Sequence, residues 1–216
     1  MFTGIITEIG TVEKSRSHGG SLRFRIKAPR SAAELEISDS VSINGACHTV
    51  VGTNNKSFEV ESVEETLKKT ALGLLKSGSR VNLELPMKAS GRFDGHIVLG
   101  HVDAVGSVVK IGRRESSSMF TFEIPTMSRK YVVPVGSIAV DGVSLTVAEI
   151  NDNRFTVSII PHTMEQTIFH SYQKGTRVNL EFDIVGKYIE RMINGEQDRT
   201  VEGKPLDEKR LRELGY

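Results

Sequence analysis

The chain has 216 residues, with 28 basic and 27 acidic side chains, one cysteine and no tryptophan, and 38% of its residues are hydrophobic. The balanced charge and low aromatic content argue against a dedicated nucleic-acid or anionic-membrane surface, and no apolar run approaches a membrane span. One cysteine excludes an intramolecular disulfide and a cysteine-rich metal site, which favours a reducing, cytoplasmic location. The N-terminal residues lack a basic region and a long apolar core, so we expect no secretory signal.

The first part of the chain has the pattern of short strands separated by turns. Residues 21–27 and 81–85 alternate apolar and polar side chains with a period of two, as half-buried antiparallel strands do. Residues 18–20 and 54–56 have the composition of turns. Residues 64–72 are acidic at the start and basic later, which predicts a short helix.

The later part of the chain repeats the earlier part. NGACHTV at 44–50 recurs as DGVSLTV at 141–147, an offset of 97, and GSRVNLE at 78–84 recurs as GTRVNLE at 175–181. Further blocks at 4–12, 58–60 and 66–70 match 100–108, 155–157 and 163–167. Matching blocks in the same order indicate a tandem duplication. About six strands in each repeat favour a small closed barrel, because closure removes exposed sheet edges.

Polar residues at 87–92 predict a linker, and Pro161 suits the first turn of a short helix in the second repeat. After residue 183 the period becomes helical, with one apolar stripe made of Ile184, Val185, Tyr188, Ile189, Met192 and Ile193. This stripe needs a partner, either a barrel or copies of itself, and Asn-Gly at 194–195 would end the helix. Residues 205–215 predict a short solvated helix. We expect barrels at 1–90 and 91–183, and a helix with a tail at 184–216.

The two repeats differ at positions that matter for chemistry. Cys47 in the first copy is replaced by Ser144 in the second, and Ile5 by His101. Two similar folds with different side chains predict two similar small-molecule sites with unequal roles. A lone histidine or cysteine is also common in cores and on surfaces, and that interpretation stays open on these residues alone. The scattered histidines have no metal-ligand spacing, so no metal is expected.

Several motifs in fixed order resemble the alpha-chain riboflavin synthase family over residues 1–193. They are MFTGII at 1–6, the block at 44–50, the two Gly-His pairs at 95–96 and 100–101, and the block at 141–147. The resemblance implies an all-β fold of two tandem six-stranded Greek-key barrels followed by a C-terminal α-helix that joins three chains into a homotrimer. It also implies an active site between the first barrel of one chain and the second barrel of its neighbour.

The reaction that the resemblance implies needs no cofactor. Two molecules of 6,7-dimethyl-8-ribityllumazine dismutate by transfer of a four-carbon unit, giving riboflavin and 5-amino-6-ribitylaminouracil in the last step of riboflavin biosynthesis. Two similar but unequal pockets suit a reaction in which identical molecules act as donor and acceptor. Holding both in place would contribute about 7–11 kcal/mol at best to lowering the barrier.

The resemblance assigns general acid–base work to His101, and places Phe2, Cys47, Ser144, Thr146 and Asp183 around the pteridine as further catalytic residues. In the first repeat it implies substrate binding by Gly4, Ile5, Ile6, Ser40, Cys47, His48, Thr49, Glu61, Ser62, Val63, Glu64, Glu65 and Thr66. In the second it implies substrate binding by Gly100, His101, Val102, Val135, Ser144, Leu145, Thr146, Ile159, Ile160, Pro161, His162, Thr163 and Met164. His96, His162 and His170 receive no catalytic role and are expected at the surface or the pocket rim.

Two residues depart from the family pattern. His48 stands where the family usually has an apolar residue, and Val135 stands where it often has lysine, so substrate affinity or rate is expected to differ. The nearest alternative function is a non-catalytic lumazine- or flavin-binding protein of the same fold. A flavin reductase would need a Gly-rich nucleotide-binding turn, which neither repeat has, and a structural oligomerisation module would not explain the repeated polar block. Docking with lumazine synthase, the preceding enzyme, is left open.

Overall fold

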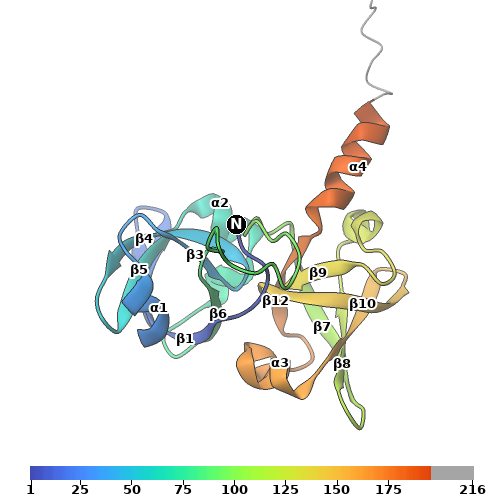
Figure 1. Cartoon of the computed structure of the whole chain (residues 1–216), viewed down its shortest axis with the longest axis horizontal. Helices are drawn as coiled ribbons and strands as arrows, with labels where there is room; N and C mark the ends of the chain where they lie inside the picture. Colours follow the sequence, from blue (N-terminus) through green and yellow to red (C-terminus); the bar gives the residue numbers. More distant parts are fainter. Residues whose placement is uncertain (196–216) are drawn as a thin grey trace, which may run out of the picture. The chain divides into compact units, whose positions relative to one another are not determined.

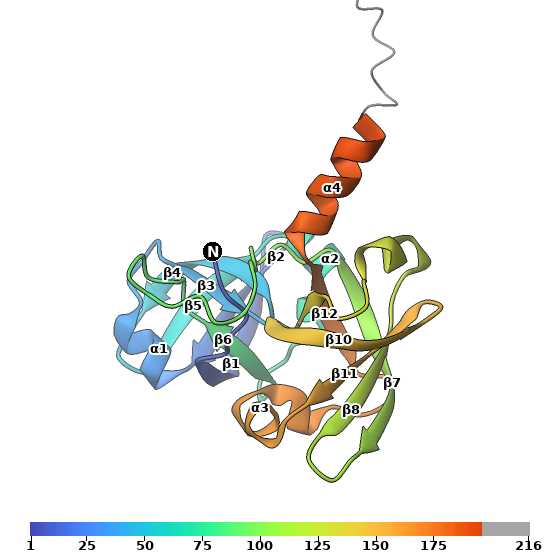
Figure 2. The same cartoon turned by 45° about the vertical axis from the view of Figure 1, so that its right-hand side comes forward.

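Two closed β-barrels and a C-terminal helix make up the computed structural model, which describes residues 1–195 (Figure 1). The first barrel contains β1 Glu8–His18, β2 Ser21–Lys27, β3 Ser40–Ile43, β4 Ala46–Thr53, β5 Ser57–Ser62 and β6 Arg80–Glu84. The second contains β7 Ala104–Arg113, β8 Ser118–Glu123, β9 Ser137–Val140, β10 Val143–Asn151, β11 Arg154–Ile159 and β12 Arg177–Phe182. Figure 2 shows the two barrels from a second direction.

Both barrels have the same strand order, and the expected pair of six-stranded antiparallel barrels is confirmed. The order β1-β2-β5-β4-β3-β6 places β5 between β2 and β4, a Greek-key arrangement, and β7 to β12 follow the same cyclic order. Period-two alternation buries Phe24 and Ile26 of β2 and turns Arg23 and Arg25 outward. Each fully buried side chain of this size contributes about 1.5–3 kcal/mol to folding.

The short helices are more numerous than the sequence pattern predicts. The first repeat contains α1 Pro29–Glu34, α2 Glu64–Lys69 and the 3₁₀ helix η1 Ala71–Leu74. The second contains η2 Thr126–Tyr131, α3 Pro161–Gln166 and η3 Ile168–Ser171. The expectation of one helix in each repeat was therefore wrong, because elements of four to six residues are too short to show a helical period. The helix predicted at 64–72 divides at Thr70, whose hydroxyl accepts the Leu72 N–H.

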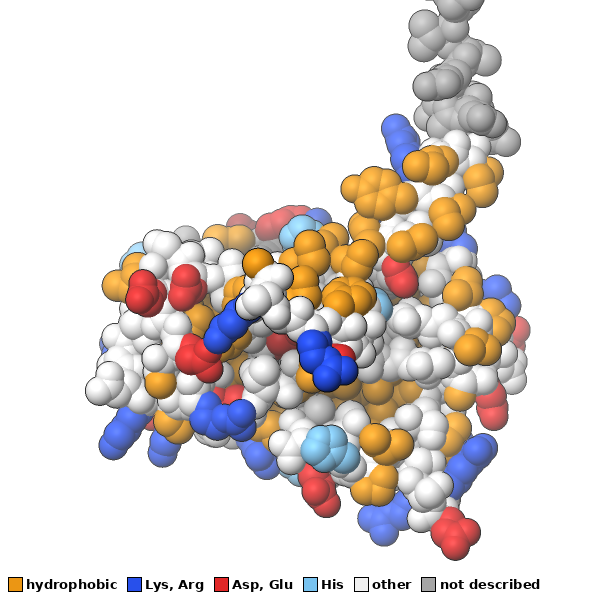
Figure 3. All heavy atoms as spheres, viewed as in Figure 1, with side chains coloured by type: hydrophobic (Ala, Val, Ile, Leu, Met, Phe, Trp, Pro, Cys, Tyr) orange, Lys and Arg blue, Asp and Glu red, His pale blue; other side chains and the backbone are white. Residues whose placement is uncertain are grey.

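The helix α4 spans Ile184–Gly195 and carries the predicted apolar stripe. Figure 3 shows hydrophobic side chains along it, and the exposed large ones are Val185, Tyr188, Ile189, Met192 and Ile193. The segment predicted at 205–215 lies outside the described residues. Within residues 1–195, no helix has both the length and the apolarity needed to cross a bilayer.

Two buried asparagines at equivalent positions connect the barrels. Asn82 of β6 donates through Nδ2 to the Asp141 carbonyl at 2.9 Å, and Asn179 of β12 donates to the Asn44 carbonyl at 2.7 Å. Each side-chain oxygen also accepts a backbone N–H from the opposite repeat. Because an unpartnered buried amide would cost about 1–3 kcal/mol, these reciprocal bonds fix how the barrels meet.

The glycines of the repeated heptapeptide lie at the centre of this contact. Gly45 and Gly142 have φ of +77° and +79°. A Cβ on Gly45 would lie 2.7 Å from the Gly142 nitrogen, and a Cβ on Gly142 would lie 2.8 Å from the Gly45 nitrogen. Only glycine allows both the left-handed backbone and this close approach. The second position of each heptapeptide is therefore dictated by the contact between the barrels.

Asp141 breaks the symmetry of this contact. Its Oδ1 accepts the Asn179 N–H at 2.8 Å, and its Oδ2 accepts the Tyr172 hydroxyl, whereas the first repeat has Asn44 and Leu75 at these places. Burial raises the pKa of the Asp141 carboxyl from 3.8 to about 7, although the hydrogen bonds from Tyr172 and Asn179 lower it in part. The raised pKa means that the folded protein holds this proton more tightly than the unfolded chain.

The substitution Asp141→Asn should flatten one part of the pH dependence of stability. A group with a raised folded pKa stabilises the fold below its unfolded pKa, and that contribution is lost as the pH rises through the folded pKa. The window for Asp141 therefore runs from 3.8 to about 7. We expect the variant to gain stability over the parent across this window, by at most roughly 4 kcal/mol. Urea unfolding across that pH range measures the difference in the free energy of unfolding between variant and parent. A difference that does not change with pH would refute the prediction.

Candidate functional site

The segments that precede β1 and β7 each cross to the opposite repeat. The Ser144 N–H donates to the Gly4 carbonyl at 2.8 Å, and the Cys47 N–H donates to the Gly100 carbonyl at 2.9 Å. A Cβ on Gly4 would lie 2.6 Å from the Ser144 Cβ, and one on Gly100 would lie 2.5 Å from the Cys47 Cβ. The structure therefore brings Cys47 and Ser144 into equivalent environments, each beside the glycine-containing segment of the other repeat.

Neighbouring residues of these segments enter the opposite barrel's packing. Ile6 packs against the core of the second barrel, and Val102 packs against the core of the first. Phe2 is fully buried with Val98 and Ala139, and its backbone forms an antiparallel bridge with Val98. The Phe2 ring is thus inaccessible in this chain, so its contribution is to hold the Gly4 segment in place.

Two buried glutamates anchor the crossing segments. Glu181 of β12 accepts the N–H groups of Leu99, Gly100 and His101 at 2.6–2.9 Å. Its counterpart Glu84 of β6 accepts two backbone N–H groups of the first segment at 2.6 and 3.0 Å. Burial raises the pKa of Glu84, and these hydrogen bonds oppose the rise. The backbone that carries His101 is therefore fixed, while its side chain is exposed and makes no hydrogen bond with the described residues.

Ser144 forms a buried pair with a histidine that sequence reasoning set aside. The His96 Nδ1 and Ser144 Oγ atoms are 2.7 Å apart, and His96 is only 7% exposed. Burial lowers the pKa of His96, while the negative charge of Asp183 opposes that change. The His96 Nε2 atom is buried and has no hydrogen-bond partner among the described residues. Ser144, His96 and Asp183 therefore form one cluster at the start of β10.

Of the two positions expected for His96, the surface is wrong because the side chain is buried, and the pocket rim stays a prediction. His96 lies in the loop between the barrels, where its N–H donates to the Thr3 carbonyl at 3.1 Å. The preceding Gly95 gives the signal that could have identified it, because a Cβ there would overlap the Thr3 oxygen. By contrast, His162 and His170 are exposed, and the His170 Nε2 lies 2.9 Å from Arg80.

His48, which stands where the family usually has an apolar residue, is buried in the first barrel with hydrogen-bond partners for both ring nitrogens. His48 is 5% exposed, and its Nδ1 lies 2.8 Å from the Ala46 carbonyl, which can only accept a hydrogen bond. The proton therefore resides on Nδ1, and Nε2 accepts the Ser62 hydroxyl at 2.7 Å. Burial lowers the pKa of His48, which keeps the ring neutral. The side chains of His48 and Ser62 are thus committed to each other, which leaves only their backbone groups for a ligand.

The remaining predicted binding residues divide into exposed and engaged groups. Exposed or half-exposed positions are Ile5, Ser40, Thr49, Val63, Thr66, Thr146, Ile160, Pro161, His162 and Thr163. Glu64 and Glu65 form ion pairs with Lys68 and Lys69 at 2.7 Å on α2. The Glu61 carboxylate binds Ser21 and Arg23. Apolar Leu145, Ile159 and Met164 contribute to the second barrel's core.

Val135 adopts a backbone conformation that is unusual for its type. Its φ is +60°, its N–H donates to the Val147 carbonyl at 3.1 Å, and its side chain is 81% exposed. Ser38 occupies the same place in the first repeat with φ of +78°. A left-handed conformation is costly for a β-branched residue, and such strain is commonly kept at functional sites. Val135 is therefore held by its loop and available to a ligand.

Replacing Val135 with glycine should stabilise the fold. The left-handed backbone costs an L-residue about 1–2 kcal/mol, which glycine avoids at a smaller cost in unfolded-state entropy. We expect the free energy of unfolding to rise by roughly 1 kcal/mol or less, measured by urea denaturation. Ser38→Gly is the matched control in the other repeat and should give a smaller change. A clear loss of stability in Val135→Gly would contradict the claim that the backbone of Val135 is strained.

Comparison with known proteins adds to this geometry. The lumazine binding domain family matches residues 3–86 and 99–183. A riboflavin synthase from Actinobacillus pleuropneumoniae is 42% identical over 193 residues, which covers 89% of this chain and 90% of that protein. Riboflavin synthases from Bacillus subtilis (strain 168) and Bacillus amyloliquefaciens are 40% identical over 194 residues, covering 90% of each chain, and 38% identical over 216 residues, covering both chains fully.

Solved structures show the same fold. LumP complexed with 6,7-dimethyl-8-(1'-D-ribityl) lumazine has a TM-score of 0.77 and 23% sequence identity, covering 84% of this chain and 99% of that one. LumP complexed with riboflavin has a TM-score of 0.78 and 24% identity with the same coverage. At this level of identity the likeness shows the fold alone.

Proposed function

The chain belongs to the riboflavin synthase family, and from that membership we propose that it converts two molecules of 6,7-dimethyl-8-ribityllumazine into riboflavin and 5-amino-6-ribitylaminouracil. The observation that carries the proposal is the near-complete match to riboflavin synthases at 38–42% identity. The duplicated barrel supports it, because a dismutation needs two similar pockets. The differences between Cys47 and Ser144, and between Ile5 and His101, make the pockets unequal.

The second repeat supplies the acid–base chemistry in this proposal. His101 is exposed on a backbone fixed by Glu181, so its imidazole can reach a substrate methyl group or an incoming nucleophile. The 7-methyl protons of the lumazine are acidic because the anion delocalises into the ring, so a modest base suffices. His96 orients the Ser144 hydroxyl, and the Asp183 charge favours the protonated form of His96 as charge develops.

The substrates would be bound mainly by exposed positions of the strands and by the starts of two short helices. Thr49 and Thr146 are exposed at equivalent places of β4 and β10, and their hydroxyls suit the ribityl chain or the pteridine edge. Backbone groups near Val63 and Ile160, at the starts of α2 and α3, would bind the substrates from the neighbouring strands. Val135 stands where the family often has lysine and cannot supply the cation that some members place near the ligand, so we expect weaker substrate affinity.

A non-catalytic lumazine or flavin carrier is the second candidate function, favoured by the fold likeness to LumP. The presence of His101, Ser144 and Thr146 favours the enzyme. Incubating a small amount of the purified chain with excess 6,7-dimethyl-8-ribityllumazine decides between them. Riboflavin that accumulates far beyond the protein concentration supports the enzyme. Saturable lumazine binding without riboflavin would establish the carrier.

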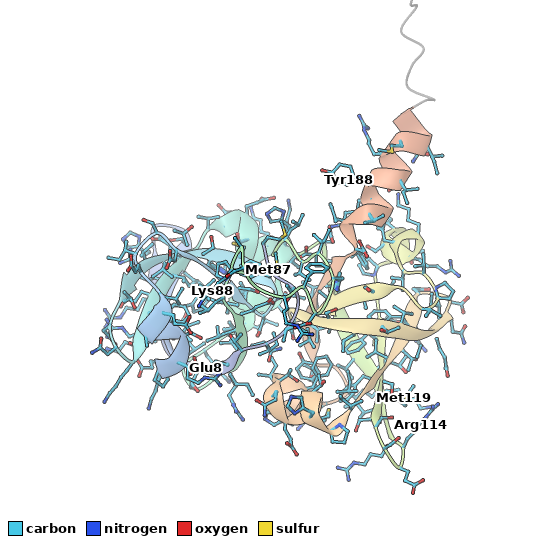
Figure 4. All side chains as sticks on the ribbon, in the orientation of Figure 1. Glu8, Met87, Lys88, Arg114, Met119 and Tyr188 are labelled. Atoms are coloured by element: carbon cyan, nitrogen blue, oxygen red, sulfur yellow. The ribbon has the colours of Figure 1, made fainter. Side chains whose placement is uncertain are left out.

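The proposed assembly is a homotrimer joined through α4, with each active site shared between the first barrel of one chain and the second barrel of a neighbour. The exposed apolar stripe of α4 supports an interface role. Figure 4 labels Tyr188 within this stripe. The proposed units are 1–90, 91–183 and 184–216. A cytoplasmic location and an association with lumazine synthase belong to the same proposal.

Placing a charge in the stripe should dissociate the trimer. Ile189→Asp with Met192→Glu would desolvate two carboxylates in an apolar interface, which costs several kcal/mol for each ion. We expect sedimentation to shift from trimer to monomer and riboflavin formation to fall with it. Arg191→Gln, on the polar side of the same helix, is the control and should remain trimeric. A double variant that stays trimeric with full activity would exclude α4 as the interface.

A further inference from the structure

The outer face of the first barrel concentrates positive charge on two neighbouring strands. Lys14 of β1 lies directly opposite Arg25 of β2, and Arg16 lies opposite Arg23. Like charges at directly opposed positions destabilise an antiparallel pair. In a chain with a net charge of only +1, this arrangement requires a compensating feature.

Carboxylates of β5 compensate the charge only in part. Glu59 binds Arg25 at 2.5 and 2.8 Å, and Glu61 lies 3.4 Å from Arg23. Lys14 and Arg16 form no ion pair with the described residues. The Arg23 Nε atom is buried and also lacks a hydrogen-bond partner there. Four cations therefore face two carboxylates, and one guanidinium donor is left unsatisfied.

These side chains surround a hollow of the size of a small anion. A cavity of about 140 Å³ is lined by Lys14, Arg16, Arg23, Arg25 and Glu59. Guanidinium groups present paired N–H donors that match phosphate oxygens, and lysine adds a mobile point charge. The unpartnered Arg23 Nε and the two unpaired cations are the donors that an anion would engage.

The second barrel provides an internal comparison. Its strands β7 and β8 have the same register and the same bulge, so the four cationic positions correspond to Lys110, Gly112, Met119 and Thr121. The Glu59 position is Thr156, whose hydroxyl lies 2.9 Å from that of Thr121. Figure 4 labels Met119 on β8. The second barrel keeps only Lys110 of the four cations, so the barrel fold does not require the full cluster, which only the first repeat carries.

We propose that the outer face of β1 and β2 in the first barrel binds a phosphate group, either as inorganic phosphate or as the phosphate monoester of a small molecule. The site lies on the outer face of the sheet, and none of the residues that line it is assigned to the lumazine reaction, although Glu61, which binds Arg23, is. It would stabilise the first barrel by neutralising the opposed cations when occupied.

Isothermal titration of the full chain with inorganic phosphate and, separately, with ribose 5-phosphate tests the proposal. We expect saturable binding of one phosphate group per chain. Arg16→Gln combined with Arg23→Gln should weaken it by about tenfold or more, because the double variant removes charge-assisted hydrogen bonds to the phosphate oxygens. Lys110→Gln in the second barrel is the matched control and should leave binding unchanged.

The two probes distinguish the sources of the phosphate group. Tighter binding of ribose 5-phosphate would identify a phosphorylated small molecule, and equal binding would identify phosphate itself. Failure of both probes to saturate at millimolar concentration would overturn the proposal, as would undiminished binding by the folded double variant. Because lumazine takes no part in the titration, either result is independent of whether the chain forms riboflavin.

Discussion

Alanine in place of His101 is expected to lower kcat for riboflavin formation by about 10²–10⁴-fold, the usual contribution of a positioned acid–base group. Its side chain is exposed and makes no hydrogen bond within residues 1–195, so the fold should tolerate the change. Steady-state kinetics with 6,7-dimethyl-8-ribityllumazine, together with an unfolding curve, measures both effects. The loss should appear in kcat more than in KM, because the group acts on the reacting atoms.

His170→Ala is the matched control for this substitution. His170 is also an exposed histidine of the second repeat, on η3, and it has no proposed role in binding or proton transfer. We expect little change in its kcat. If His101→Ala retained full kcat, general acid–base catalysis would have to be assigned to the His96–Ser144 pair instead.

Loss of the Glu181 carboxylate is expected to have the largest effect on stability. Its two oxygens accept the N–H groups of Leu99, Gly100 and His101. In Glu181→Ala these donors lose their acceptor, at about 1–3 kcal/mol for a fully buried group such as the Gly100 N–H and less for the two partly buried ones. We expect the free energy of unfolding to fall by roughly 3 kcal/mol or more, and the remaining folded protein to show reduced kcat because the His101 segment is released.

Glu165→Ala provides the comparison, because Glu165 is exposed on α3. Its effect should lie within about 0.5 kcal/mol, as for most surface substitutions. Urea denaturation of both variants gives the two values. Equal stability of Glu181→Ala and Glu165→Ala would show that the crossing segment does not depend on this carboxylate.

The fold could be predicted from the sequence because the duplication states each pattern twice. Alternation at residues 21–27 matches β2 at both ends, and the repeated blocks at 78–84 and 175–181 contain β6 and most of β12. The repeated Asx-Gly pairs were recognised as important. Glycine is needed in these pairs because Gly45 and Gly142 approach each other closely. Neither a hydrophobic period nor the composition predicts this contact, because the two residues are far apart in the chain.

The arrangement around Ser144 could be predicted only in part. The sequence identifies Ser144 and Asp183 but not His96, because its partner lies 48 positions away, beyond β7, β8 and β9. Similarly, the sequence does not show that Phe2 packs fully buried against Val98 and Ala139, and its catalytic role stays a prediction. His48 was expected to alter ligand binding, and its bond to Ser62 shows a compensation inside the barrel. Each of these depends on burial, which a linear pattern does not specify.

An isotope-mixing experiment tests the two-substrate reaction most directly. Equal amounts of unlabelled 6,7-dimethyl-8-ribityllumazine and lumazine carrying heavy carbon in its four-carbon unit would be incubated with the purified chain, and the riboflavin analysed by mass spectrometry. Transfer between two lumazines predicts unlabelled, half-labelled and fully labelled riboflavin, with the half-labelled species twice as abundant as either other. Riboflavin without the half-labelled species, or no riboflavin at all, would contradict the proposed dismutation.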